Sequence, residues 1–145
     1  MFEPKTLNFL NTKTFSAKNR HNLVRIDNLR NPGMQDDDLF HSTEFDILVE
    51  KLKEAKAAGR SVTCFIGAHV IKCGLSRYLI WLMENGYITH LASNGAGSIH
   101  DFELAYLGGT SEHVPTAIED GSFGMWEETV SHQVVSFTED GYYYE

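Results

Sequence analysis

Residues 61–97 have the sequence SVTCFIGAHVIKCGLSRYLIWLMENGYITHLASNGAG, which is the strongest indication of how this chain folds. Two short apolar runs, residues 62–66 and 88–92, are each followed by a loop that contains glycine. The segment between them has apolar residues at the spacing of one buried helix face: Ile71, Leu75, Tyr78, Leu79, Leu82 and Met83. Strand, helix and strand in this order predict a βαβ unit with parallel strands. Ligands of open parallel sheets bind at the carboxyl ends of the strands, where both glycine loops fall.

The flanking segments predict an α/β domain over residues 42–129, a parallel sheet flanked by helices. A helix is expected to begin at about Thr43, whose hydroxyl caps it, and to end at Gly59. Its apolar face is predicted to consist of Phe45, Leu48, Val49, Leu52 and Ala55. Further helices are expected over residues 98–107, over 112–118 and from about Met125, with a short strand near residues 134–137. Residues 1–41 are interpreted as an extended basic arm and linker, and residues 130–145 as a tail.

The predicted sheet is incomplete. Two parallel strands do not form a stable sheet by themselves, and a doubly wound domain needs at least four or five. The chain is therefore expected to be half of a larger fold, or a protomer that borrows strands from a partner. Uncovered strand edges and apolar helix faces predict a homo-oligomer.

Length, charge and cysteine content limit the possible functions. A chain of 145 residues suits one domain with a core, and a formal net charge of −8 argues against a nucleic-acid partner. Residues 1–30 contain six Lys and Arg, whereas none occurs after Arg77, so the arm either contacts an acidic partner or is a solvated terminus. Two cysteines and the lack of a leader or of a long apolar run predict a cytoplasmic protein with no membrane partner.

The second glycine loop has the spacing of a phosphate-binding turn. Gly95-Ala96-Gly97 supplies the first two glycines of a G-x-G-x-x-G dinucleotide loop, and His100 stands where the third belongs. Glycine lets a phosphate approach the backbone, and free N–H groups at a helix start can bind it. Glycines in a tight turn between strand and helix also occur without any ligand. Both interpretations stay open.

Other polar residues near the loops allow further interpretations. A metal site would use His69, His100 and Asp101, with Cys73 as a fourth ligand, but no recognised metal-binding spacing is present. Lys72, the only lysine beyond residue 56, is expected at a helix start, where it either meets a phosphate or is solvated. Cys73 is interpreted as a small buried residue or as a reactive thiol. Spacing alone assigns no catalytic residue and no metal ligand.

Three segments together resemble one known family. They are residues 67–76 (GAHVIKCGLS), 89–103 (THLASNGAGSIHDFE) and 121–129 (GSFGMWEET). Residues 24–129 are similar to the deoxyhypusine synthase-like family, most of all to its bacterial and archaeal branch. The resemblance implies a Rossmann-like, NAD-binding α/β fold and a homotetramer with sites at subunit interfaces. The founding enzymes oxidise spermidine with NAD and transfer its aminobutyl group, through an imine with an enzyme lysine, to a lysine of a translation factor.

The resemblance also assigns candidate cofactor-binding residues. It implies that NAD contacts both glycine loops and an acid that follows the second, namely Gly67, Ala68, His69, Ser93, Asn94, Gly95, Ala96, Gly97 and Asp101. Ile99 and His100 replace two adjacent glutamates of the founding enzymes, and no residue here corresponds to the imine-forming lysine. We therefore expect no catalytic residue in this chain, which resembles the N-terminal half of a truncated family member.

The sequence supports two classes of function and a weaker third. The first is an NAD-dependent transferase of alkyl groups, incomplete alone, whose substrate is a polyamine such as spermidine. The alternative is a non-catalytic, degenerate nucleotide-binding or structural remnant. A metal-dependent hydrolase that uses His69, His100 and Asp101 is the third.

Overall fold

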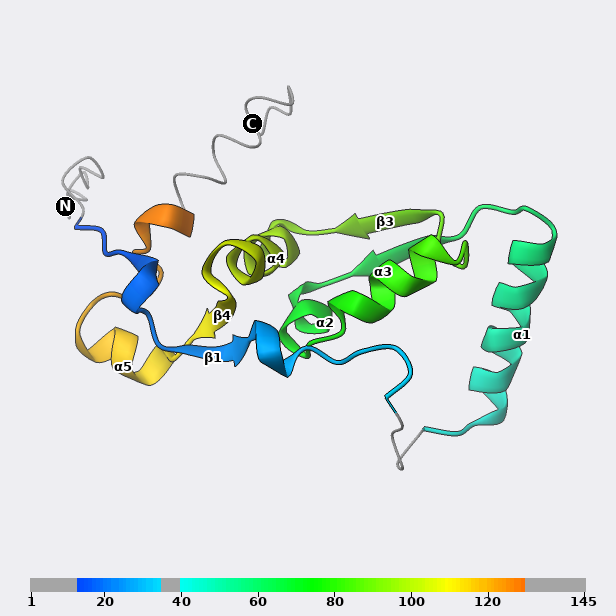
Figure 1. Ribbon diagram of the computed structural model, residues 1–145, viewed down its shortest axis with the longest axis horizontal. Coiled ribbons are helices and arrows are strands. Elements are labelled where there is room, and N and C mark those ends of the chain that lie inside the picture. The colour runs from blue at the N-terminus through cyan, green and yellow to red at the C-terminus, as the bar shows by residue number, and fades with distance from the viewer. Residues whose placement is uncertain (1–12, 35–39, 130–145) are drawn as a thin grey trace, which may run out of the picture. The chain divides into compact units, whose positions relative to one another are not determined.

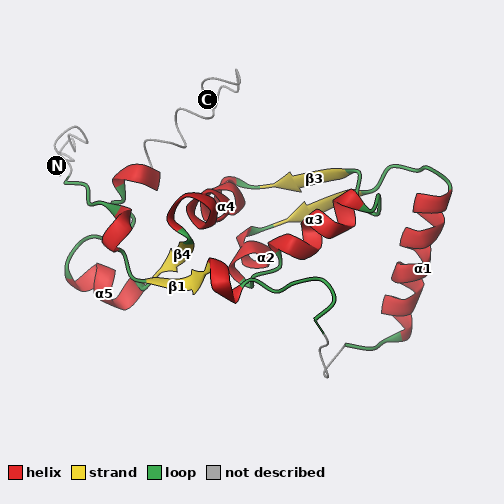
Figure 2. Cartoon of the chain, in the orientation of Figure 1, coloured by secondary structure: helices red, strands yellow, loops and turns green. Residues whose placement is uncertain are grey.

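A computed structural model describes residues 13–34 and 40–129 of the chain. The protein is a mixed α/β protein with small two-stranded sheets and helices (Figures 1 and 2). It divides into two compact units, one formed by residues 22–111 and the other by the flanking segments up to residue 21 and from residue 112. We call them the central unit and the terminal unit. The predicted tail strand near residues 134–137 lies outside the described residues.

The central unit contains the predicted parallel strands. Strands β2 (Thr63–Ile66) and β3 (His90–Ser93) are parallel, with Thr63 opposite His90 and Ile66 opposite Ser93. Helices α2 (Ala68–Lys72) and α3 (Ser76–Glu84) connect them (Figure 1). The prediction of a βαβ unit from the sequence is confirmed. The sheet has only these two strands among the described residues, as the sequence analysis predicts.

The connection between the strands is two helices instead of the single predicted one. Gly74 interrupts the apolar pattern with a φ of +77°, a left-handed conformation that ends α2. A Cβ at this position would lie 3.1 Å from the backbone oxygen of Asn28. The Arg30 N–H also donates to the Gly74 carbonyl at 2.9 Å, so a loop from earlier in the chain packs directly against the break. As a result, Lys72 ends a helix rather than beginning one, which corrects the prediction.

Replacing Gly74 with alanine should destabilise the central unit by about 2–3 kcal/mol. The left-handed conformation alone costs a non-glycine residue about 1–2 kcal/mol, and the added methyl group would press on the Asn28 backbone. Gly86→Ala is the matched control, because its φ is +69° but no atom lies within 4 Å of the added Cβ. Urea unfolding of both variants measures the difference. Equal destabilisation by the two substitutions would contradict the close approach at Gly74.

Helix α4 (Gly95–Leu107) follows β3 and is confirmed at the predicted place. The Asn94 side chain caps its start, and Gly108 ends it with a φ of +68°. The chain then continues as β4 (Gly109–Glu112), which pairs with β1 (Asn22–Arg25), and β1 is followed by the short 3₁₀ helix η3 (Ile26–Asn28). Neither strand is predicted by the sequence analysis, and β1 falls in the segment interpreted as an extended arm.

The core of the central unit joins α2, α3, α4 and Ile88, which lies two residues before β3. Its buried members are Ile71, Leu79, Ile88 and Leu104, with Val24, Leu29, Cys64, Ile66, Val70 and Leu82 packed against them. Cys73 is exposed, so its interpretation as a small buried residue is wrong. No helix in the described part of the chain is long and apolar enough to cross a membrane.

Helix α1 (Thr43–Ala57) has the predicted bounds but not the predicted burial. Its N-cap is Ser42 and not Thr43, because the Ser42 hydroxyl accepts from the Phe45 N–H at 3.1 Å. None of its residues is buried, and Phe45, Ile47 and Leu48 are all exposed. The apolar face of α1 is therefore only partly covered by the described chain, because Val49, Leu52 and Ala55 are half-buried.

The terminal unit brings two distant segments together. The 3₁₀ helix η2 (Ala17–Asn19) and helix α5 (Val114–Glu119) belong to it, and residues 127–129 are helical. Phe15 pairs with Trp126 through backbone hydrogen bonds to Met125 and from Glu127. The helix predicted over 112–118 thus begins at Val114, because Glu112 belongs to β4.

A carboxylate also ties the two segments of the terminal unit. Glu128 accepts hydrogen bonds from the Ser16 hydroxyl at 2.6 Å and from the Ala17 N–H at 2.7 Å. These bonds, the Ser16 hydroxyl first, lower the pKa of Glu128 below its ordinary value. Because the pKa is lower in the folded state, this contribution to stability is present above the ordinary pKa and is lost as pH falls through the lowered one.

Candidate functional site in the central unit

Both glycine loops begin at the same edge of the β2–β3 sheet. Ile66, the last residue of β2, lies opposite Ser93, the last residue of β3. Gly67 then starts α2, and Asn94 starts α4. The sequence predicts this juxtaposition because the carboxyl ends of parallel strands share one edge.

The start of α4 presents backbone donors at this edge. The Asn94 side chain accepts from the Gly97 N–H at 3.1 Å. The N–H groups of Gly95 and Ala96 lie in the first turn, where a helix supplies no acceptor of its own. With the positive end of the helix dipole, such groups favour an anion.

The glycines of the two loops are required for different physical reasons. A Cβ on Gly97 would overlap the Ser93 hydroxyl oxygen, so the packing of the chain on itself requires glycine there. No atom lies within 4 Å of a Cβ built on Gly67 or Gly95. Open space at these two positions leaves room for a ligand, whereas Gly97 is explained without one.

A pocket of about 220 Å³ opens beside this edge. Its wall is largely apolar, with polar groups from α3, β3 and α4, and it consists of Ile66, Ile71, Ser76, Leu79, Ile80, Met83, Leu91, Ser93, Gly97, Ser98 and Asp101. The hydroxyl oxygen of Ser76 is buried and has no hydrogen-bond partner among the described residues. A buried hydroxyl without a partner is costly, so this position would gain from a polar ligand atom.

The structure brings some of the predicted cofactor residues together and not others. Ser93, Gly97 and Asp101 line the pocket. The remaining predicted residues belong to the same edge of the sheet but not to the pocket wall, and they are Gly67, Ala68, His69, Asn94, Gly95 and Ala96. Ser76 and Ser98 are polar members of the wall that the sequence analysis does not single out. No periodic or motif signal distinguishes them.

On the side of α4 that faces β4, three polar residues form a buried network. Thr110 is fully buried, and its hydroxyl donates to the Glu103 carboxylate at 2.5 Å. His100 Nδ1 lies 2.7 Å from the same hydroxyl oxygen. The His100 ring thus contacts Thr110 and does not line the pocket beside the glycine loops. The described residues contain no group of three or more His, Cys, Asp or Glu side chains that could hold a metal ion.

Comparisons of the chain with models of known protein families, with curated proteins and with solved structures gave no match. The fold alone assigns the protein to a class, that of mixed α/β proteins with small sheets. The resemblance to the deoxyhypusine synthase-like family stays a prediction.

Proposed function

We propose that the central unit is a Rossmann-like nucleotide-binding unit whose ligand is NAD, in line with the resemblance to the deoxyhypusine synthase-like family. The observation that supports this most is the buried hydroxyl of Ser76, which lacks a partner in the wall of an otherwise apolar pocket. A ligand with a largely apolar ring system would cover the apolar wall, and a polar atom on that ring would form a hydrogen bond with the Ser76 hydroxyl.

The groups around the pocket suit the different parts of a nucleotide. The apolar side chains offer a surface for a ring, and the Asp101 carboxylate can accept hydrogen bonds from ribose hydroxyls. The first turn of α4 is next to the pocket and suits a phosphate. The volume of about 220 Å³ lies below the usual range of about 300–1,000 Å³ for ligand sites. The pocket is therefore proposed to hold one nucleoside phosphate of the dinucleotide, with the rest along Gly67, Ala68 and His69.

The proposed reaction of the whole family member needs more than the pocket provides. Bound NAD would supply the hydride acceptor for oxidation of a polyamine such as spermidine. An imine needs a lysine nucleophile with a lowered pKa, and no lysine is among the residues that line the pocket. We therefore propose that this chain binds the cofactor in the cytoplasm and depends on another chain or segment for aminobutyl transfer.

Self-association of the chain is part of the proposal. Phe65, on the face of β2 opposite the core, is 81% exposed. The exposed apolar residues of α1 add to the uncovered apolar area. A second copy of the chain would cover these faces. Light scattering at micromolar concentration that shows only a well-ordered monomer would contradict this part.

Calorimetric titration of the full chain with NAD tests the nucleotide proposal. We expect saturable binding, which Asp101→Asn weakens about tenfold because the amide keeps one acceptor oxygen but loses the negative charge and the second acceptor. Asp27→Asn is the matched control, since Asp27 is an exposed carboxylate of the same unit that lies outside the pocket. Ser76→Ala separates binding from folding: its hydroxyl has no partner, so NAD affinity should fall while the free energy of unfolding does not.

A second candidate function follows from Gly97. Because its glycine is explained by contact with Ser93, the loop can persist in a remnant that binds no nucleotide. Absence of heat with NAD, together with normal folding, would favour this alternative. Stoichiometric uptake of zinc in a parallel titration would instead favour the metal-dependent hydrolase.

A further inference from the structure

The pocket beside the glycine loops has one charged side chain in its wall, the carboxylate of Asp101. Lys, Arg and His are absent from the described residues that line it. The other polar side chains of the wall are the hydroxyls of Ser76, Ser93 and Ser98, and the rest of the wall is apolar. The distribution of charge therefore limits which part of a dinucleotide this pocket can take.

The two rings of NAD differ in charge, because the oxidised nicotinamide ring is positively charged and the adenine ring is neutral. Ile71 and Leu79, which line the pocket, belong to the buried core and are 5% and 8% exposed. Contact with such side chains favours a neutral ring, whereas a cationic ring would lose hydration there without gaining a partner. Asp101 is exposed, so its carboxylate belongs to the solvent side of the pocket. The apolar part of the wall therefore suits adenine.

The nicotinamide end of NAD needs reactive groups that the pocket does not offer. Oxidation of an amine by hydride transfer releases a proton, so an acid–base side chain has to lie near the ring. Asp101 is the only ionisable side chain in the wall. His69 and Lys72 belong instead to α2, which starts at the first glycine loop. The nicotinamide end is therefore better served along α2 than in the pocket.

The carboxylate of Asp101 is available to a ligand, because it has no hydrogen-bond or ion-pair partner among the described residues. The Ser98 hydroxyl, by contrast, donates to the Gly95 carbonyl at 2.9 Å. The Ser76 hydroxyl is buried and also lacks a partner in the described part of the chain. The two groups that can meet a ligand are thus a carboxylate that accepts and a hydroxyl that both donates and accepts.

We infer that the pocket takes the adenosine half of NAD, with the ribose at Asp101. The inference rests on the proposed function and specifies which half of the cofactor the pocket holds. A ribose hydroxyl would donate to the Asp101 carboxylate, and the Ser76 hydroxyl would meet a nitrogen of the adenine ring. NADP carries an additional phosphate on that ribose, which the Asp101 carboxylate would repel. The pocket is therefore expected to select NAD over NADP.

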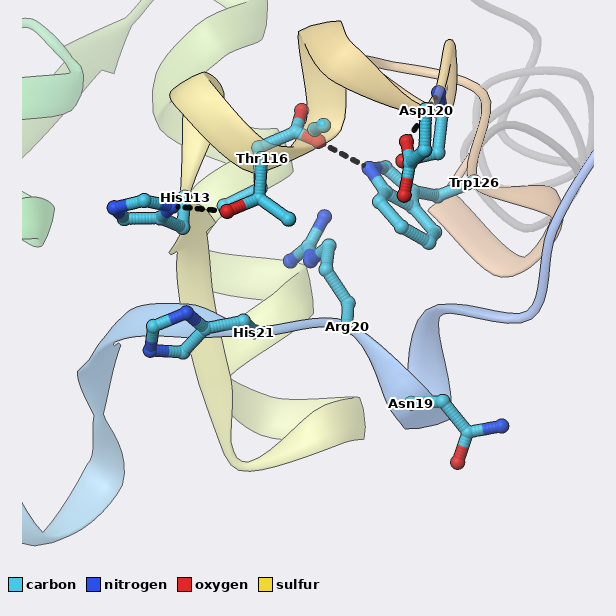
Figure 3. A pocket seen from close by; sticks show the side chains of 10 residues that line it. Asn19, Arg20, His21, His113, Thr116, Asp120 and Trp126 are labelled. Carbon is cyan, nitrogen blue, oxygen red and sulfur yellow. Dashed lines mark hydrogen bonds between the residues drawn. The ribbon is translucent and has the colours of Figure 1, made fainter.

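The terminal unit contains a second pocket, of about 160 Å³, around Arg20 (Figure 3). The Arg20 guanidinium lies 5.5 Å from the centre of the Trp126 ring, and the Trp126 indole N–H donates to Glu112 at 2.7 Å. Because the wall of this pocket carries both positive and negative side chains, a neutral purine ring is not expected there. The Trp126 indole N–H is therefore an internal control for binding to the pocket of the central unit.

AMP and nicotinamide mononucleotide are the probes for this inference, because they share the ribose and the phosphate and differ in the ring. In calorimetric titration of the full chain, AMP should bind saturably, and nicotinamide mononucleotide should bind at least about tenfold more weakly. AMP should also shift the NMR signal of the methyl group of Met83, which lines the pocket. The signal of the Trp126 indole N–H should not move.

NADP tests the position of the ribose. It should bind at least about tenfold more weakly than NAD, and Asp101→Asn should reduce this difference to about threefold or less because the repelling charge is gone. Asp27→Asn, which changes an exposed carboxylate outside the pocket, should leave the ratio of the two affinities unchanged. Ile80→Gln should weaken AMP binding about threefold by removing apolar cover, whereas Ile47→Gln, at a similarly exposed isoleucine of α1, should not.

The outcomes separate this inference from the proposed function. If NAD binds but nicotinamide mononucleotide binds more tightly than AMP, the inference is wrong and the proposed function stands. Equal affinity for NAD and NADP, or a difference that Asp101→Asn leaves unchanged, would also overturn the inference. Absence of binding by all four nucleotides would overturn both. AMP that binds where NAD does not would support the adenosine pocket and overturn the proposed function alone.

Discussion

Replacing Trp126 with alanine should abolish the structure of the terminal unit. Removal of a buried tryptophan side chain costs about 3–5 kcal/mol. The substitution also removes the ring under Arg20, the ring contact with Phe15 and the donor to Glu112. Hydrogen exchange of the Phe15 and Glu127 amides measures the effect, because both amides donate across the pairing of the two segments. We expect both amides to lose their protection.

Trp126→Phe is the matched control for this prediction. It keeps an aromatic ring for Arg20 and Phe15 but removes the N–H that donates to Glu112, so about 1–2 kcal/mol should be lost. The Thr89 amide, which donates to the Val62 carbonyl, reports the stability of the central unit in the same experiment. Protection of the Phe15 amide that survives in Trp126→Ala would show that the indole does not hold the terminal unit together.

Thr110→Val should destabilise the central unit by about 3 kcal/mol, because a buried polar network loses its shared hydroxyl. Valine fills nearly the same volume, so packing is conserved while Glu103 loses a donor and His100 a partner. Glu103 is only 3% exposed, and water cannot take the place of the hydroxyl. Urea unfolding and exchange of the Ile26 amide, which donates to the Gly108 carbonyl, measure the loss.

Thr110→Ser separates the hydroxyl from the methyl group. It keeps the hydrogen bonds to Glu103 and His100 and should cost only about 1 kcal/mol for the lost methyl. A larger loss for serine than for valine would mean that packing around Thr110, and not the network, stabilises this part of the unit.

The sequence predicts the elements whose signals are local. The parallel strands and α4 follow from apolar runs, from helical spacing and from glycine at Gly108, and the structure has them where expected. The two-stranded sheet of β1 and β4 could not be predicted in this way. β4 begins with Gly109 and contains Thr110, Ser111 and Glu112, a composition with little strand propensity, and its partner lies more than eighty residues earlier in the chain. Pairing between such distant segments leaves no periodic signal in either.

The candidate sites likewise contain some features that the sequence predicts and others that depend on tertiary packing. The common edge of the two glycine loops follows from strand order alone, whereas the partnerless Ser76 hydroxyl depends on how α3 packs. The break at Gly74 depends on the approach of Asn28, a contact that no local pattern records. The pocket around Arg20 joins segments from near the two ends of the described chain. Its residues become neighbours through contacts between these distant segments, such as the pairing of Phe15 with Trp126 and the hydrogen bonds of Glu128.

The uncovered side of β2 has a consequence for every measurement of stability on this protein. If a second copy covers Phe65, folding and association share one equilibrium, and dilution shifts that equilibrium toward the unfolded chain by mass action. The melting temperature would then rise with protein concentration. A free energy of unfolding would have meaning only at one stated concentration, and the Gly74 and Thr110 variants would have to be compared with the parent chain at equal molarity.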